Sequence, residues 1–171
     1  EEFDAGTSYI SNKADWLEGK WAGMVSAHGE DRRGDTAVSP ELLSRIGKTM
    51  TTPPENLQLN SKLLRILKGR AESIGSGQNI DWATAEHLAF GSLLLEGNPV
   101  RLSGQDSGRG TFSQRHSVFV DQVTEERYIP LANLDPEQAM FEVIDSPLSE
   151  ASVMGFEYGF SQAEPNALVM W

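Results

Sequence analysis

Cysteine is absent from this 171-residue sequence, and basic residues are few. A chain without cysteine has no disulfide, no thiolate metal site and no thiol nucleophile. Its 14 lysines and arginines stand against 25 acidic residues, which gives a formal net charge of -11. Non-specific binding to DNA or RNA needs clustered Lys and Arg, so no nucleic-acid partner is expected.

Long apolar runs and histidine clusters are missing as well. The longest apolar run falls far short of the roughly 20 residues that span a bilayer, so no membrane partner is expected. The acidic N-terminus has no apolar segment of the kind found in secretion signals. His28, His87 and His116 lack metal-ligand spacing, so we expect no metal site built within this chain; His87 is predicted to be structural or exposed.

What the sequence does contain is an alternation of helix and strand signals. Capping residues and apolar spacing predict helices over 39–51, 61–74, 81–96 and 149–162. Short apolar runs predict strands over 100–102, 118–120, 141–144 and 167–171, the last of them buried. This order is typical of an α/β layer fold. The strand–helix–strand order after residue 141 predicts a parallel sheet.

Side-chain patterns along the helices and the N-terminal segment give further expectations. In the second helix the basic residues Lys62, Arg65, Lys68 and Arg70 are predicted to form a solvated face. In the third, Trp82, Ala85, Ala89 and Leu93 fall near one apolar stripe. Near the N-terminus, Trp16 and Trp21 are predicted to pin a polar segment onto a neighbouring surface.

The segment 145–159 carries the most informative pattern. Pro147 and Ser149 suit the start of a helix, which places Glu150 in its first turn, near the positive end of the helix dipole. Glu150 also follows a strand of the predicted parallel sheet, where ligands bind in such folds. Either Glu150 simply begins the helix, or it shares a proton with a buried ligand. Gly155 and Gly159 lie on one helix face and indicate either close packing onto the sheet or close approach to another subunit or to a bound cofactor ring.

The glycine-rich loop at 104–111 invites comparison with phosphate-binding loops, but neither standard pattern fits. Gly110 stands where a Walker loop has lysine, and Ser113 stands where a dinucleotide loop has its third glycine. A tight surface turn is one interpretation. The polar residues that surround the loop are dense for a mere turn; they include Gln105, Asp106, Arg109, Arg115 and His116. Ser113, His116 and Asp121 are neighbours in sequence only and predict no catalytic triad.

Several of these segments carry a family resemblance. The Pro-Leu-Ser-Glu turn at 147–150 resembles the pyrimidine-binding domain of thiamine-diphosphate-dependent 2-oxo acid dehydrogenases. Residues 101–117 are similar to the decarboxylating component of the 2-oxoglutarate dehydrogenase complex, and segments 12–19 and 79–86 follow that family's order. The resemblance spans nearly the whole chain. It implies a transketolase-like α/β pyrimidine domain, a mainly parallel sheet flanked by helices, over 61–171. Residues 1–60 would form an N-terminal arm and linker with short helices.

The resemblance also implies a function and site residues. Glu150 would be catalytic, binding the aminopyrimidine ring of thiamine diphosphate and favouring its imino tautomer, and Leu148 would be a second cofactor contact. The enzyme would decarboxylate 2-oxoglutarate and pass the succinyl group to a lipoyl arm, in the tricarboxylic acid cycle. It would be cytoplasmic in bacteria or mitochondrial in eukaryotes. Its partners would be a second subunit of a homodimer and the lipoyl-bearing succinyltransferase component. The glycine-rich loop would lie near the active centre and the subunit interface.

The resemblance further implies that part of the enzyme is missing from this sequence. Thiamine enzymes hold the diphosphate and Mg²⁺ with a Gly-Asp-Gly…Asn motif, which this sequence lacks. We therefore interpret the chain as a C-terminally truncated fragment that is inactive by itself. Two alternatives remain open. The chain could be a non-catalytic subunit-assembly module, or it could belong to the equivalent component of a pyruvate or 2-oxoadipate dehydrogenase.

Overall fold

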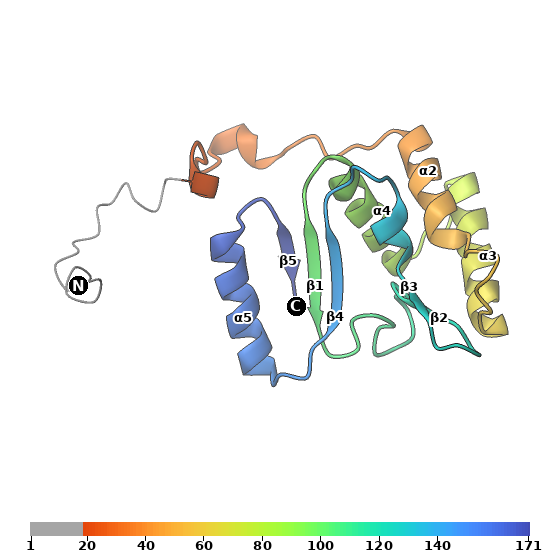
Figure 1. Ribbon diagram of the computed structural model, residues 1–171. Coiled ribbons are helices and arrows are strands. Elements are labelled where there is room, and N and C mark those ends of the chain that lie inside the picture. The colour runs from red at the N-terminus through yellow and green to blue at the C-terminus, as the bar shows by residue number, and fades with distance from the viewer. Residues whose placement is uncertain (1–18) are drawn as a thin grey trace.

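A three-stranded parallel sheet with helices on both faces forms the centre of the computed structural model, which describes residues 19–171 (Figure 1). The strand order is β4-β1-β5, so β1 lies between the other two. The strands are β1 (Val100–Gly104), β4 (Phe141–Asp145) and β5 (Leu168–Met170). The predicted α/β class and the parallel sheet are therefore confirmed.

Four α-helices in the described residues account for the four predicted ones. They are α2 (Pro40–Thr51), α3 (Ser61–Ser76), α4 (Trp82–Leu95) and α5 (Glu150–Ala163). Short 3₁₀ helices, η2 (Gly19–Trp21), η3 (Gly29–Arg32) and η4 (Pro130–Asn133), interrupt the connecting segments. The strand predicted at 118–120 forms only the two-residue β2 (Phe119–Val120). It pairs antiparallel with β3 (Arg127–Tyr128) in a small second sheet.

Local side-chain caps explain where the helices begin. The Ser39 hydroxyl accepts a hydrogen bond from the backbone N–H of Leu42 at 3.2 Å, and the Asp81 carboxylate accepts one from Thr84 at 2.7 Å. Ser149 caps α5 in the same way. Each of these bonds satisfies a backbone donor that the first helical turn leaves free. Because capping depends on nearest neighbours in the chain, the helix starts could be predicted to within about a residue.

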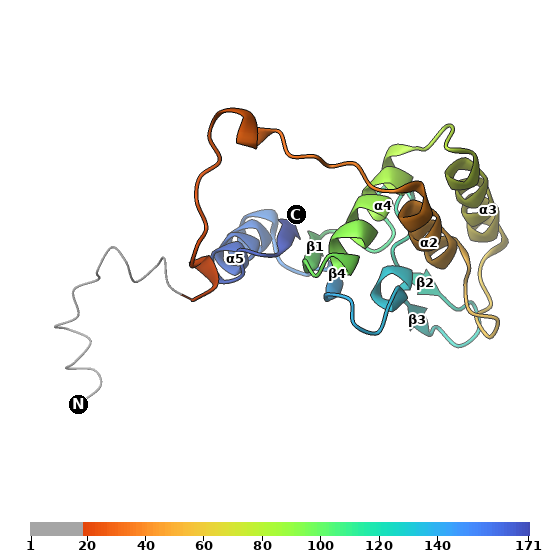
Figure 2. The same ribbon diagram turned by 90° about the horizontal axis from the view of Figure 1, so that it is seen from above.

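The two faces of the sheet are covered by different helices. Side chains alternate along a strand, and Val100 and Leu102 of β1 point into the hydrophobic core that includes Leu94 of α4. Arg101, between them, pairs instead with Glu157 of α5. In Figure 2, α4 and α5 lie on opposite sides of β1. The helix that carries Glu150 is thus fixed to the sheet face opposite the main core.

The main core extends beyond the sheet into α2. Ile46 and Met50 of α2 belong to the same buried cluster as Leu94 and Phe141. Helix α2 lies within the segment that the sequence assigned to the N-terminal arm, and the division at residue 60 stays a prediction.

Of the predicted apolar stripe of α4, only Leu93 packs against the described core. Trp82 is 87% exposed, and Ala85 and Ala89 are exposed as well. The buried face runs through His87, Gly91 and the positions around them, because α4 packs closely against α2: a Cβ on Gly91 would lie 2.5 Å from Ile46 Cγ2. Because α4 is strongly apolar, its periodicity could not indicate which of its faces would be covered by α2 and by the sheet.

Two further expectations about burial are corrected. Arg70 was predicted to lie on a solvated face, yet it is 5% exposed, because its guanidinium donates hydrogen bonds to backbone carbonyls of the loop before β2. Strand β5 was predicted to be buried, yet it lies at an edge of the described sheet, with Leu168 36% exposed. Its apolar residues reflect the contact with β1 on one side only.

The N-terminal segment contacts the end of α5. Trp21 Nε1 donates to the carbonyl oxygen of Gln162 at 2.7 Å, and Lys20 pairs with Glu164. Trp21 therefore pins this segment as predicted, whereas Trp16 lies outside the described residues. No helix among residues 19–171 is long and apolar enough to cross a membrane.

Candidate functional site

The start of α5 lies at the carboxyl end of the parallel sheet, as predicted. Strand β4 ends at Asp145, and Ser149 caps the helix that begins at Glu150 (Figure 1). The Glu150 side chain is exposed, and its own backbone N–H, followed by the side chain of Gln105, lowers the pKa of its carboxyl group. Glu150 is therefore an accessible, ionised hydrogen-bond acceptor at the edge where parallel α/β sheets bind ligands.

The loop after β1 is joined to the segment that leads into α5. Gln105 Nε2 donates to Glu150 Oε1 at 2.9 Å. The Ser146 N–H donates to the Gly104 carbonyl at 2.8 Å, and the Gly108 N–H donates to Asp145 Oδ1 at 2.9 Å. These contacts form because β1 and β4 are neighbouring parallel strands, with Gly104 beside Asp145. The glycine-rich loop therefore belongs to the same edge as Glu150.

Gly104 makes this approach possible. Its φ is +144°, a conformation that other residues rarely adopt, and a Cβ there would lie 3.0 Å from Trp171 Cδ1. The sequence offered Gln105 only as one of several polar residues around the loop. Its contact with Glu150 could have been suspected from a single signal: both residues lie a few positions after the carboxyl ends of predicted strands.

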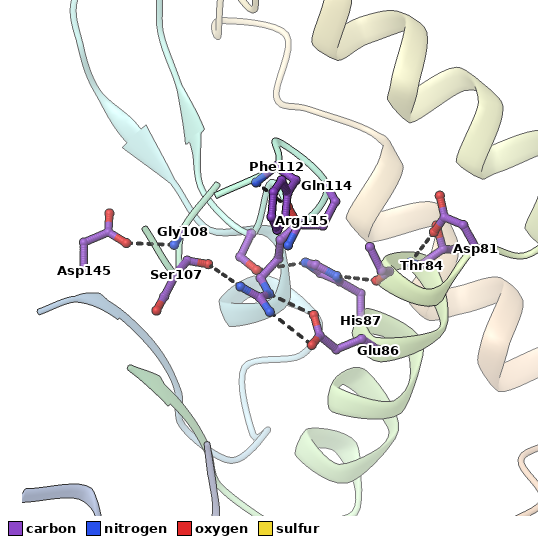
Figure 3. A network of polar contacts seen from close by, with 12 residues as sticks. Asp81, Thr84, Glu86, His87, Ser107, Gly108, Phe112, Gln114, Arg115 and Asp145 are labelled. Carbon is purple, nitrogen blue, oxygen red and sulfur yellow. Dashed lines mark hydrogen bonds and ion pairs between the residues drawn. The ribbon is translucent and has the colours of Figure 1, made fainter. Parts of the chain in front are cut away.

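Buried polar groups from α3 and α4 anchor the far half of the loop, and Figure 3 shows Glu86 and His87 of α4 among them. Arg70 donates to the backbone carbonyls of Gln114 and Arg115 at 2.5 and 3.0 Å. Arg115 makes a two-pronged ion pair with Glu86, with nitrogen–oxygen distances of 2.8 and 3.2 Å. Such paired contacts fix both distance and orientation. The loop is therefore held by the helical core as well as by hydrogen bonds among its own residues.

His87 is part of the same anchor and is structural, one of its two predicted readings. It is 2% exposed, and its Nδ1 donates to the Ala83 carbonyl at 2.8 Å. Its Nε2 accepts a hydrogen bond from the Ser117 hydroxyl at 2.9 Å. Burial lowers the pKa of His87 to about 4, so the ring is neutral in the folded protein.

The protein should lose stability as the pH falls from about 6.5 to about 4. His87 takes up a proton near pH 6.5 when unfolded but only near pH 4 when folded, so its stabilising contribution is complete above pH 6.5 and disappears on acidification. A shift of this size corresponds to a loss of about 3 kcal/mol. Urea unfolding at closely spaced pH values should show that the free energy of unfolding depends less steeply on pH in His87→Asn than in the native sequence. An unchanged slope in that variant would contradict the assignment.

The other polar residues near the loop do not form a catalytic triad. The Asp121 carboxylate accepts hydrogen bonds from the backbone N–H groups of Gln58, Val123 and Thr124, which lower its pKa to about 2. Asp121 thus links the loop at Gln58 to the turn at residues 121–124 and does not orient His116. No group of three metal-ligating side chains occurs within residues 19–171.

Leu148 lies in the turn between β4 and Glu150, with its side chain 44% exposed. Its backbone N–H donates to Ser146 Oγ at 3.2 Å, which shapes the turn. The apolar side chain is thus free to contact a ligand beside Glu150. That contact stays a prediction.

The glycines of α5 do not pack against the sheet. A Cβ added to Gly155 or Gly159 would meet no atom within 4 Å in the described structure. Met154, Phe156 and Tyr158 on the same helix are each more than half exposed. Packing onto the sheet therefore does not explain these glycines. The helix face that carries them is open in the described structure, which is compatible with close approach of another chain.

Comparisons with known proteins agree with this geometry. The family model described as "Transketolase, pyrimidine binding domain" matches residues 78–171. The chain is 55% identical to a "2-oxoglutarate dehydrogenase E1 component" of Brucella anthropi, and 54% identical to proteins of the same name from Brucella canis and Brucella abortus. Each comparison covers 99% of this chain but 17% of the relative. The chain thus spans about a sixth of these relatives.

Proposed function

Because the chain belongs to the transketolase pyrimidine-binding domain family, we propose that it supplies the pyrimidine-binding residues of a 2-oxoglutarate dehydrogenase. This succinyl-transferring enzyme uses thiamine diphosphate to decarboxylate 2-oxoglutarate, a step of the tricarboxylic acid cycle. The proposal rests on the similarity to 2-oxoglutarate dehydrogenase E1 components, which are identical to this chain at 54–55% of the aligned residues. The single observation that carries it is the placement of Glu150 at the carboxyl end of the sheet, in the turn that the family resemblance identifies.

The geometry around Glu150 fits an aminopyrimidine ring. Gln105 occupies Oε1, and no side chain within residues 19–171 donates a hydrogen bond to Oε2, which leaves an acceptor for a ring nitrogen. The exposed Leu148 provides an apolar contact beside it. Thiamine diphosphate, when bound, supplies the electron sink for decarboxylation. The part of Glu150 is to orient the ring and to hold a proton at its nitrogen.

The remaining parts of the site come from elsewhere in the proposed enzyme. The residues for Mg²⁺ and the diphosphate are assigned to a region outside this chain, since the sequence has no Gly-Asp-Gly…Asn motif. A second subunit would cover the open face of α5 around Gly155 and Gly159 in a homodimer. The succinyl group would pass to the lipoyl-bearing succinyltransferase component. A bacterial enzyme of this kind would act in the cytoplasm.

Calorimetric titration of thiamine diphosphate with Mg²⁺ tests the proposal. We expect binding to the complete enzyme and weak or no binding to this 171-residue chain alone, because the diphosphate contacts are missing. Glu150→Ala in the complete enzyme should weaken binding, since it removes a charged hydrogen-bond partner. Absence of binding in the complete enzyme would contradict the proposal. It would leave a non-catalytic assembly module, built on the open face of α5, as the better account.

A further inference from the structure

Within residues 19–171, the side chain that donates a hydrogen bond to Glu150 is a neutral amide. Gln105 follows β1, Glu150 begins α5, and Nε2 of the first donates to Oε1 of the second at 2.9 Å. A lysine or arginine at this position would hold the carboxylate as an ion pair. An amide instead orients the carboxylate through one oxygen. The second oxygen can still bond to another partner and share a proton with it.

Gln105 is itself held in place on both sides. Before it, the Gly104 carbonyl accepts a hydrogen bond from Ser146; after it, the Gly108 N–H donates to Asp145. These two bonds join the loop to the residues that lead into α5. The backbone of Gln105 is therefore fixed relative to the segment that leads into Glu150, because β1 and β4 are paired in register.

The far half of this loop is tied to the helical core. Arg70 of α3 donates to two of its backbone carbonyls, and His87 of α4 pairs with Ser117. A short, partly buried chain of contacts thus leads from α3 and α4 to the carboxylate of Glu150. A flexible surface turn would offer no such support.

We propose that Gln105 is a positioning residue for Glu150: it holds Oε1 in a fixed direction so that Oε2 is presented to the pyrimidine nitrogen. This inference rests on the proposed function. It assigns Gln105 no contact with the reacting atoms. The hydrogen bond from Gln105 restricts the carboxylate of Glu150 to fewer orientations before the cofactor binds. Less conformational entropy is then lost on binding, which is the advantage of a preorganised site.

The first measurement uses the 171-residue chain without cofactor. The carboxyl carbon of Glu150 is titrated by NMR in the native sequence, in Gln105→Ala and in Gln105→Asn, whose amide is one methylene shorter. Removing the donor should raise the pKa of Glu150, because Gln105 stabilises its ionised form. Arg109→Gln is the matched control: it breaks the exposed Arg109–Asp106 ion pair in the same loop and should leave the titration unchanged.

The second measurement uses the complete enzyme loaded with thiamine diphosphate and follows hydrogen–deuterium exchange at the thiazolium carbon. Gln105→Ala should slow this exchange about tenfold and move its pH profile upward, with the KM for the 2-oxo acid unchanged. Gln105 is exposed, so the unfolding midpoint should stay the same.

Each outcome separates the two proposals. Normal exchange in Glu150→Gln would refute the proposed function, whatever Gln105→Ala does. Exchange that is lost in Glu150→Gln but normal in Gln105→Ala would overturn only the positioning role. A raised KM together with normal exchange in Gln105→Ala would also overturn it, since the amide would then contact the substrate instead of Glu150.

Discussion

Replacing Glu150 by glutamine in the complete enzyme should slow activation of the cofactor by about 10²–10⁴-fold, the usual contribution of a positioned acid or base. Glutamine keeps the size of the side chain and can still bond to Gln105. It cannot share a proton with a ring nitrogen as a carboxyl group does. The loss should therefore appear in the rate of proton exchange at the thiazolium carbon, and not in the fold.

The stability of Glu150→Gln is expected to be nearly native, because the side chain is exposed and takes no part in the core. Circular dichroism and urea unfolding measure this directly. Glu72→Gln on α3 is a matched control: it removes the same charge from an exposed helix position, where the side chain is 70% exposed. Near-normal turnover in Glu150→Gln would remove Glu150 from the mechanism.

The location of Glu150 could be predicted from sequence because every determinant lies within a few residues. Pro147 and Ser149 fix the start of α5, and the apolar run of β4 precedes them. Caps and strand periodicity depend on near neighbours, so they can be identified without knowledge of the rest of the fold. The parallel sheet followed from the order of the elements alone.

The partners of the site residues could not be predicted in the same way. Gln105 and Glu150 are 45 positions apart, and Arg70 reaches carbonyls 44 and 45 positions away. Arg70 was expected in solvent because a basic row on an amphipathic helix is usually solvated. Arg70 is buried by a loop from another part of the chain. The periodicity of its own helix gives no information about that contact. The position of Glu150, the proposed catalytic residue, depends on local sequence, whereas the contacts that support it depend on tertiary packing.

Arg101 provides the strongest link between α5 and the sheet. Its guanidinium donates to both carboxylate oxygens of Glu157, at 2.7 and 3.0 Å, and to Glu142 of β4 at 2.9 Å. The Phe156 and Phe160 rings lie against it, with centroids 5.3 and 4.7 Å away. The hydrogen bonds with Glu157 raise the pKa of Arg101 above its ordinary value, so the guanidinium stays charged.

Arg101→Leu should lower the free energy of unfolding by about 3–5 kcal/mol, the usual cost of removing one partner from a buried ion pair. The reason is the carboxyl group that remains: Glu157 is 4% exposed and would be left buried without its main hydrogen-bond donor. Urea unfolding of the variant measures the loss. Lys68→Leu, which breaks the exposed Lys68–Glu72 pair on α3, should change stability by less than about 1 kcal/mol.

The double variant Arg101→Leu/Glu157→Leu shows whether the cost comes from the stranded charge. Replacing both partners by apolar side chains removes the unpaired carboxylate, so most of the lost stability should return. The double variant should also keep α5 on the sheet, because Leu side chains can pack against the Phe156 and Phe160 rings. Equal destabilisation in the single and double variants would mean that the ion pair fixes the position of α5 on the sheet in a way that apolar packing cannot replace. The placement of Glu150, at the start of the same helix, would then depend on Arg101 as well.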